Sequence, residues 1–235
     1  MREDKRKYNE LRPITIETQV LDYPGGSVMI TCGKTKVLVS VMIEETVPSF
    51  KKNSGEGWVT AEYNMLPASS PERIKRERFK VSGRTYEIQR LIGRAMRMAV
   101  DLKLLGERSL LIDCDVIQAD GGTRTTSITG AYIALELAVR SLLNRGLIKK
   151  SPLKEAIAAV SVGVVEGKTI LDLNYIEDSS ADVDMNVVMT ESGKIIELQG
   201  TAEHEPFDRK TLDELLSVAE HGLKELFERQ RQALA

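Results

Sequence analysis

The chain passes from a strand-like run to a helical pattern within residues 116–139, VIQADGGTRTTSITGAYIALELAV. Between the two lie Asp120, two glycines, Arg124 and a run of hydroxyl side chains. A helix that begins there leaves backbone N–H groups without partners, and these groups and the helix dipole favour an anion. A guanidinium adds a planar fork that suits phosphate. Simple helix capping explains the same residues equally well, so both interpretations stay open at this point.

Outward from this segment, hydrophobic periodicity predicts further strands and helices. Hairpins are expected to turn at Gly33-Lys34, Glu166-Gly167 and Ser192-Gly193. The other expected elements are strands over 58–67 and 109–118, helices over 85–102 and 123–145, and a final helix capped by Asp208. This order predicts an α/β (α+β-like) fold of mixed sheets with antiparallel hairpins. We expect residues 1–235 to form a single domain with a weak internal duplication.

The composition is ordinary for a soluble globular protein, with 42% hydrophobic and 29% charged residues. No apolar run approaches the length of a membrane span, and the charged N-terminus lacks the apolar core of a signal peptide. Cys32 and Cys114 lie in strand-like apolar runs without the spacing of a metal or redox site, so we expect both to be buried and reduced. Together these features predict a cytoplasmic protein that does not associate with membranes.

Charge is distributed unevenly along the chain. Residues 72–97 hold nine Lys or Arg against three Glu, whereas residues 169–193 hold six carboxylates and no Lys or Arg. The two regions suggest a polyanion bound at the first and a metal at the second, or, alternatively, a solvated helix face and an acidic loop. Arg84 differs from the other cations, because a positive charge at a helix start opposes the helix dipole and costs stability unless an anion binds there.

Several carboxylates gather in residues 177–184, EDSSADVD. Asp178 and Asp184 lie six positions apart, and Asp182 and Asp184 fall on one side of an extended chain. Clustered carboxylates repel one another and imply a cation, and oxygen ligands alone point to Mg²⁺ or Mn²⁺. An acidic approach to a hairpin is the alternative explanation. Two arginine sites plus one carboxylate cluster suggest phosphoryl transfer, in which a protein mainly positions groups and neutralises charge.

Five blocks of the chain, in the same order, resemble ribonuclease PH over essentially the whole length. They are GWVTAEYNMLPASS, GRTYEIQRLIGRAMR, DCDVIQADGGTRTTSITGA, EDSSADVDMNVVMT and IIELQGTAEHEPF. The resemblance implies a reversible phosphorolytic 3′→5′ exoribonuclease. Such an enzyme uses inorganic phosphate to trim tRNA precursors and other RNA 3′ ends, and releases nucleoside diphosphates. It also implies a duplicated fold of ββαβα units (ribosomal protein S5 domain 2-like), assembled into a hexameric ring that is a trimer of dimers.

The resemblance also assigns roles to residues. The phosphate site of the family falls on Arg84, Gly122, Thr123 and Arg124, and the neighbouring hydroxyls that could contribute are those of Thr126 and Ser127. The metal site falls on two carboxylates, with a further acidic candidate beside them; these are Asp178, Asp184 and, as the further candidate, Asp182. The arginines and the two metal carboxylates would be the catalytic groups. The region that holds the tRNA body falls on a basic loop whose cations are Arg73, Lys75, Arg76, Arg78 and Lys80.

The chain departs from the family pattern at a few positions. The family usually begins with Arg, any residue, Asp, Gly and Arg, but this chain has Lys5 in place of the glycine. Other departures are Glu56, Asn64 and His204. The rival interpretations are an exosome-type ring subunit, a catalytically inactive RNA-binding ring protein, and a metal-dependent hydrolase that needs no phosphate site. The block GTAEHEPF favours the bacterial self-assembling enzyme over the exosome subunit.

Overall fold

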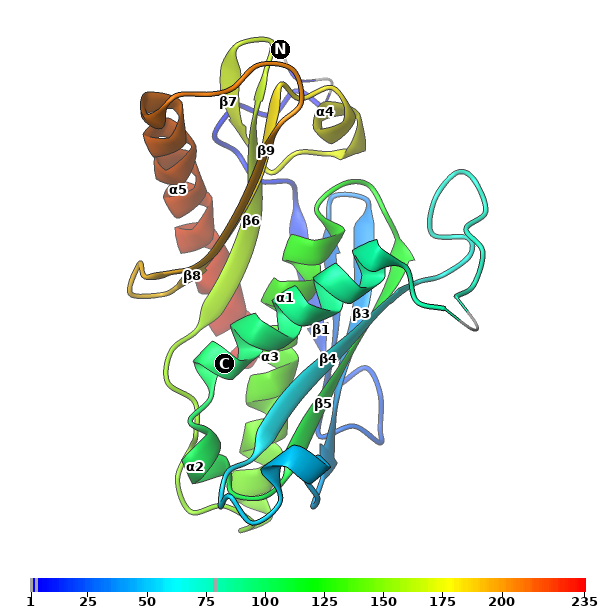
Figure 1. The fold of residues 1–235 in the computed structure, drawn as a ribbon, viewed down its shortest axis with the longest axis vertical. Coiled ribbons are helices and arrows are strands. Elements are labelled where there is room, and N and C mark those ends of the chain that lie inside the picture. Colours follow the sequence, from blue (N-terminus) through cyan, green and yellow to red (C-terminus); the bar gives the residue numbers. More distant parts are fainter. Residues whose placement is uncertain (1, 3, 78–79) are drawn as a thin grey trace.

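Five strands form the first sheet of the computed structural model, which describes residues 2, 4–77 and 80–235 (Figure 1). Their order is β1-β2-β3-β5-β4, and all neighbours are antiparallel except β4 and β5. Buried residues alternate along β3 and β5, so one face of this sheet is packed and the other is open. The strands are β1 (Ile14–Thr18), β2 (Gly26–Cys32), β3 (Thr35–Glu44), β4 (Trp58–Met65) and β5 (Ser109–Gln118).

Four antiparallel strands form the second sheet, in the order β7-β6-β8-β9. The hairpin between the first two turns at Glu166 and Gly167, whose φ angles of 51° and 71° are both left-handed. The hairpin between the last two turns at Gly193, with a φ of 83°. The strands are β6 (Ile157–Val165), β7 (Lys168–Leu171), β8 (Val183–Thr190) and β9 (Ile195–Ala202).

Helix α3 connects the two sheets. It packs against β2 and β3 of the first sheet and against β6 of the second, and it is therefore buried on most sides. Helix α1 lies across β4 and beside α3, whereas α5 packs against β6 and β7 (Figure 1). The helices are α1 (Gly83–Ala99), α2 (Leu102–Leu105), α3 (Thr123–Asn144), α4 (Tyr175–Ser179) and α5 (Arg209–Leu234), with a 3₁₀ turn at Ser49–Lys51. Within the described ranges no helix is both long and apolar enough to cross a membrane.

The expected mixed α/β class with hairpins is confirmed, and all three predicted turns occur. Apart from the short α2, the order β3-β4-α1-β5-α3 is the expected ββαβα unit, and the second half repeats it with one added strand. Sequence reasoning missed β1 and α4, because each has only five residues and shows no clear period. Residues 177–184 were expected between strands, but Asp178 lies on α4, which a capping box of Asn174 and Glu177 begins.

Candidate active site

A cavity of about 840 Å³ opens between the start of α3, the start of α1, helix α4 and strand β8. It brings together most of the residues expected to act, although they come from separate parts of the chain. The expected residues that line it are Arg73, Arg84, Gly122, Thr123, Arg124, Asp178 and Asp184. The cavity is polar on both sides, with the arginines on the first half of the chain and the two carboxylates on the second.

The glycine loop (residues 120–124) turns the chain from β5 into α3. Gly121 and Gly122 adopt φ angles of 74° and 64°, which favour glycine. A Cβ on Gly121 would lie 2.6 Å from the carbonyl oxygen of Leu173, so this glycine also allows the loop to approach the segment before α4. The glycines thus fix the distance between the loop and the helix that carries Asp178.

The first turn of α3 has no side-chain cap. Helices α1, α2, α4 and α5 each begin with a cap, from Ser82, Asp101, Asn174 and Asp208. Helix α3 instead has Gly122 at the capping position before Thr123, and no side chain in the described part of the molecule accepts a hydrogen bond from its first turn. Its N–H groups and positive dipole end therefore point into a polar cavity, which favours the anion interpretation over simple capping.

The hydroxyl groups that follow the loop serve the interior of the protein. Thr125 Oγ1 donates to the carbonyl oxygen of Gly122 at 2.9 Å, and Ser127 Oγ donates to that of Thr123 at 2.8 Å. Thr126 and Ser127 are buried and do not line the cavity, so the expectation that they contribute to the phosphate site is wrong. Among the hydroxyl residues of this run (123–127) Thr123 lines the cavity, because the turn of the helix directs Thr125, Thr126 and Ser127 toward the core.

The two arginines reach the cavity from helix starts. Arg84 is the second residue of α1, where no acidic residue occupies the first turn, and it forms no ion pair with any described residue. Arg124 is the second residue of α3, and its Nη1 donates to Gln199 Oε1 at 2.9 Å. Its contact with Glu87 is longer, at 3.4 Å, so an anion in the cavity would meet only a weak competitor.

Asp178 and Asp184 face these arginines across the cavity. Loss of hydration raises the pKa of Asp178 although the residue stays partly exposed, whereas the charges of Arg124 and Arg84 lower it. Burial raises the pKa of Asp184 as well, and the negative charges of Asp178 and Glu203 raise it further. Two carboxylates that disfavour each other's charge form a site that a cation would stabilise.

This pair of carboxylates suits a magnesium or manganese ion that is bound together with the substrate phosphate. Described residues contain no group of three His, Cys, Asp or Glu that could hold a metal without a substrate. Mg²⁺ is commonly bound by one or two carboxylates together with water and substrate phosphate, so the two aspartates fit. Asp182 does not line the cavity; it lies just before β8, where its backbone N–H donates to the carbonyl oxygen of Val164 and its carbonyl oxygen accepts from the backbone N–H of Glu203.

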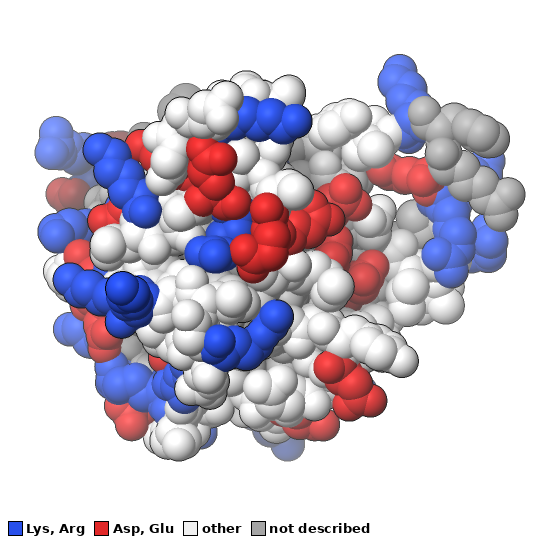
Figure 2. Space-filling view, turned by 90° about the horizontal axis from the view of Figure 1, so that it is seen from below, with Lys and Arg blue, Asp and Glu red and all other residues white. Residues whose placement is uncertain are grey.

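The basic loop, of which the structure describes residues 73–77 and 80, projects from the body of the molecule beside the cavity, at the right of Figure 1. Basic side chains also gather at this edge in the space-filling view of Figure 2. Arg73 lines the cavity, whereas Lys75, Arg76 and Lys80 are exposed and do not. Arg78 lies outside the described residues.

Comparison with known proteins decides the family. The 3′ exoribonuclease family models match the chain with domain 1 over residues 10–141 and domain 2 over residues 155–222. Ribonuclease PH of Crocosphaera subtropica is 56% identical, with 100% of this chain and 98% of that protein covered. Ribonuclease PH of Bacillus subtilis is 54% identical, with 100% and 97% covered. The chain belongs to the ribonuclease PH family.

Solved structures agree in fold. Rice (Oryza sativa) Rrp46 superposes with a TM-score of 0.81 at 20% identity, with 100% of both chains covered. The Archaeoglobus fulgidus exosome with RNA bound to the active site gives 0.81 at 23% identity, with 97% and 92% covered. At these identities the likeness concerns the fold alone, and the ribonuclease PH relatives give the function. The chain is an enzyme, a phosphorolytic 3′→5′ exoribonuclease with inorganic phosphate as co-substrate.

Several residues that support this ribonuclease PH site were missed from the sequence. Tyr63 Oη donates to Thr123 Oγ1 at 2.9 Å, so the Thr123 hydroxyl is left to donate toward the cavity. Near the N-terminus, Arg2 forms a bidentate pair with Glu177, both bonds being 2.7 Å long. The signal was present as three arginines within the first twelve residues. No local pattern shows that these side chains are buried, or that the partner of Arg12 lies 160 positions further along the chain.

Lys5 stands where the ribonuclease PH family usually has glycine, and this difference should affect the stability of the folded protein. Lys5 adopts a φ of 65°, the left-handed conformation for which the family's glycine is suited. Lys5→Gly should therefore raise the free energy of unfolding by about 0.5–1 kcal/mol, the left-handed penalty less the larger unfolded-state entropy of glycine. Thermal unfolding measures this. Lys7→Gly is the matched control and should destabilise, because Lys7 has no positive φ; a gain in both variants would contradict the explanation.

Proposed function

We propose that orthophosphate binds at the glycine loop and attacks the last phosphodiester of an RNA whose 3′ end enters the cavity. A phosphate oxygen forms a bond to the scissile phosphorus, the 3′-oxygen of the penultimate nucleotide leaves, and a nucleoside diphosphate is released. The observation that carries the proposal is one cavity in which the uncapped start of α3 and two arginines lie opposite two carboxylates. The reaction breaks a phosphodiester P–O bond and forms the P–O–P bond of the nucleoside diphosphate. The exchange costs little free energy, so the reaction should run in both directions.

The arginines would reduce the repulsion between the two phosphates. Arg124 would offer a bidentate fork, and Arg84 a second positive charge from the other helix. The backbone at Gly122 and Thr123 would donate N–H groups, together with the Thr123 hydroxyl that Tyr63 orients. Such fixed donors need no reorganisation when negative charge develops at the reacting phosphorus.

Asp178 and Asp184 would hold a Mg²⁺ or Mn²⁺ ion against the RNA phosphate. The bound ion supplies Lewis-acid stabilisation of the phosphoryl oxygens and the leaving oxygen. Within the protein, the two carboxylates would hold that ion on the side of the cavity opposite the arginines. Their raised pKa values support the assignment, because ionised carboxylates in this place need a nearby cation.

One experiment tests the reaction at this site. An RNA with extra 3′ nucleotides is incubated with and without orthophosphate, and the products are separated by charge. We expect nucleoside diphosphates only when phosphate is present, and extension of the RNA when nucleoside diphosphate is in excess. Monophosphates released without added phosphate would show hydrolysis and would overturn the proposal.

We also propose that the basic loop binds the body of tRNA precursors, which the enzyme trims. Replacing Lys75, Arg76 and Lys80 with alanine should lower the salt dependence of tRNA binding, because about two to three fewer counterions are released. Arg73→Ala should additionally slow turnover of a short unstructured RNA, because Arg73 lines the cavity. Binding titrations at several salt concentrations measure the first effect. Equal losses of the triple variant on tRNA and on short RNA would contradict the division.

We propose further that the enzyme assembles with copies of itself. A homohexameric ring, a trimer of dimers, would arrange several cavities around one RNA-binding surface, and sedimentation would detect it. We treat residues 1–235 as one folding unit, because Leu234 at the chain end and Ile157 of β6 pack in the core of the first sheet. A cytoplasmic location likewise stays a prediction that fractionation of cells can test.

A further inference from the structure

The guanidinium of Arg12 is buried between the two halves of the molecule, with 4% of the residue exposed. Its Nε and Nη2 donate to the two carboxylate oxygens of Asp172 at 2.9 and 2.7 Å, and its backbone N–H donates to the same carboxylate at 2.8 Å. The remaining nitrogen, Nη1, donates to the carbonyl oxygen of Asp120 at 2.5 Å. One side chain thus spans the distance from the segment before α4 to the glycine loop.

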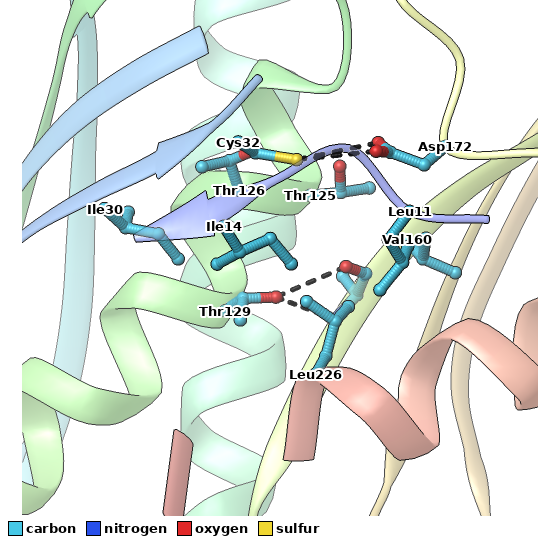
Figure 3. Close-up of a pocket in the computed structure, with 11 residues that line it drawn as sticks. Leu11, Ile14, Ile30, Cys32, Thr125, Thr126, Thr129, Val160, Asp172 and Leu226 are labelled. Atoms are coloured by element: carbon cyan, nitrogen blue, oxygen red, sulfur yellow. Dashed lines mark hydrogen bonds between the residues drawn. The ribbon is translucent and has the colours of Figure 1, made fainter. Parts of the chain in front are cut away.

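Asp172 is itself held firmly in place. Its φ of 53° is left-handed, a costly conformation for a residue with a Cβ, which persists only where the surroundings enforce it. Its backbone N–H donates to the carbonyl oxygen of Ser161 at 2.7 Å, and its carbonyl oxygen accepts from Arg2 and Arg6. Figure 3 shows its carboxylate directed toward Cys32, whose Sγ lies 3.5 Å from Oδ2, beside a cavity of only about 20 Å³. Asp172 therefore provides a fixed point for Arg12.

The carbonyl groups of the glycine loop accept hydrogen bonds from Thr35 and from Arg12, which Asp172 holds in place. Thr35 Oγ1 donates to the carbonyl oxygen of Gly121 at 2.7 Å and accepts from the backbone N–H of Asp120 at 2.9 Å. Arg12 bonds the carbonyl oxygen of Asp120 from the other side. Since these carbonyls are directed to the interior, the N–H groups at the start of α3 are left directed to the cavity.

Helix α4 depends on the same N-terminal segment but on a different arginine. Arg2 pairs with Glu177, the residue before Asp178, and none of its hydrogen bonds reaches the glycine loop. Arg2 and Arg12 are therefore two buried arginines with similar partners and different positions. The pair offers a matched comparison within one segment.

We propose that Arg12 is a positioning residue for phosphate: its fork, fixed on Asp172, holds the glycine loop in the conformation that directs the α3 N–H groups and Arg124 toward the phosphate. The inference rests on the proposed phosphate site at this loop. Arg12 does not line the cavity, so it acts through the loop and not on the phosphate directly. Its role differs from general stability, because the bond to Asp120 sets the geometry of one loop.

The test measures phosphate affinity directly, by titration calorimetry with inorganic phosphate in the absence of RNA, alongside thermal unfolding. Arg12→Lys keeps the charge beside Asp172 but loses the fork that also reaches Asp120, so it should fold and bind phosphate roughly ten-fold more weakly. Thr35→Val removes the other attachment of the loop without changing charge, and should also weaken phosphate binding. Arg2→Lys is the control for a buried arginine: it loses the bidentate pair with Glu177, whereas Arg6 and Ser161 still hold Asp172, so it should lose stability while retaining phosphate affinity.

Arg124→Ala separates the two ideas. If Arg124→Ala leaves phosphate affinity unchanged, the proposed phosphate site is wrong and the inference falls with it. If Arg124→Ala weakens binding but Arg12→Lys and Thr35→Val both bind as the wild type does, the site stands and the positioning role is wrong. Phosphate affinity that follows the melting temperature across all variants, Arg2→Lys included, would show a purely structural role and would equally overturn the inference.

Discussion

Replacing Arg124 with alanine is expected to raise the apparent KM for phosphate roughly ten- to hundred-fold, and replacing Arg84 should do the same. Each arginine would contribute charge-assisted hydrogen bonds of about 1.5–3 kcal/mol, and about 1.4 kcal/mol corresponds to a factor of ten. Arg124→Lys should recover only part of the loss, because it keeps the charge without the bidentate fork. Initial rates against phosphate concentration, with RNA binding measured in parallel, give the result.

Arg90→Ala is the matched control for this pair of changes. Arg90 lies on α1 with Arg84 and is exposed, but it does not line the cavity, so its removal should leave the KM for phosphate unchanged. The fold should survive in both active-site variants, since Arg84 is exposed and Arg124 faces the cavity. Unchanged phosphate dependence in both single variants, with a collapse of RNA binding, would mean that the two arginines hold the RNA backbone instead.

Asp184→Asn is expected to abolish most turnover and to stabilise the protein at neutral pH. Loss of Lewis-acid stabilisation worth several kcal/mol lowers kcat by roughly a hundred-fold or more. The raised pKa of Asp184 has the opposite effect on folding. The folded protein holds the Asp184 proton more tightly than the unfolded chain does. That contribution to stability is fully present below pH 3.8, the ordinary pKa, and is lost as the pH rises through the raised value.

The asparagine variant is neutral at every pH, so it avoids this loss. Its melting temperature without added metal should therefore exceed that of the wild type at neutral pH. Melting curves from pH 3 to 8 measure the difference. Asp182→Asn is the control, because Asp182 does not line the cavity. A variant that turns over normally, or one that gains no stability at neutral pH, would argue against a repulsive carboxylate pair at Asp184.

The parts of this site that could be predicted from the sequence are those with a local signature. Gly121 and Gly122 between a strand and a helix, and Arg84 at a helix start, indicate an anion because the cause lies within a few residues. The likeness to ribonuclease PH added the pairing of Arg84 with Arg124 and of Asp178 with Asp184, which spacing alone leaves open. The error over Thr126 and Ser127 has a physical reason: a hydroxyl near a helix start can bond the preceding turn as well as a ligand.

The supporting contacts could not be predicted, because they depend on how distant segments pack. Arg12 meets Asp172 only when β1 joins the first sheet and β7 joins the second. Tyr63 reaches Thr123 only because β4 pairs parallel with β5, the strand that leads into the glycine loop. Helix α4 is too short to show a period; its capping box, Asn174 with Glu177 three positions later, is by contrast a local signature that sequence reasoning overlooked.

The placement of opposite charges on the two halves of the chain has a consequence for how the catalytic rate can change. The first half provides the N–H groups and arginines that would attract phosphate, and the second half provides both carboxylates. The separation between nucleophile and metal is then a property of the contact between the halves, set in part where Gly121 touches the start of α4. A substitution at the contact between the two halves can therefore change the catalytic rate while every reacting side chain stays the same. Neither half alone would bring the two arginines together with the two aspartates, so we expect neither to carry out phosphorolysis.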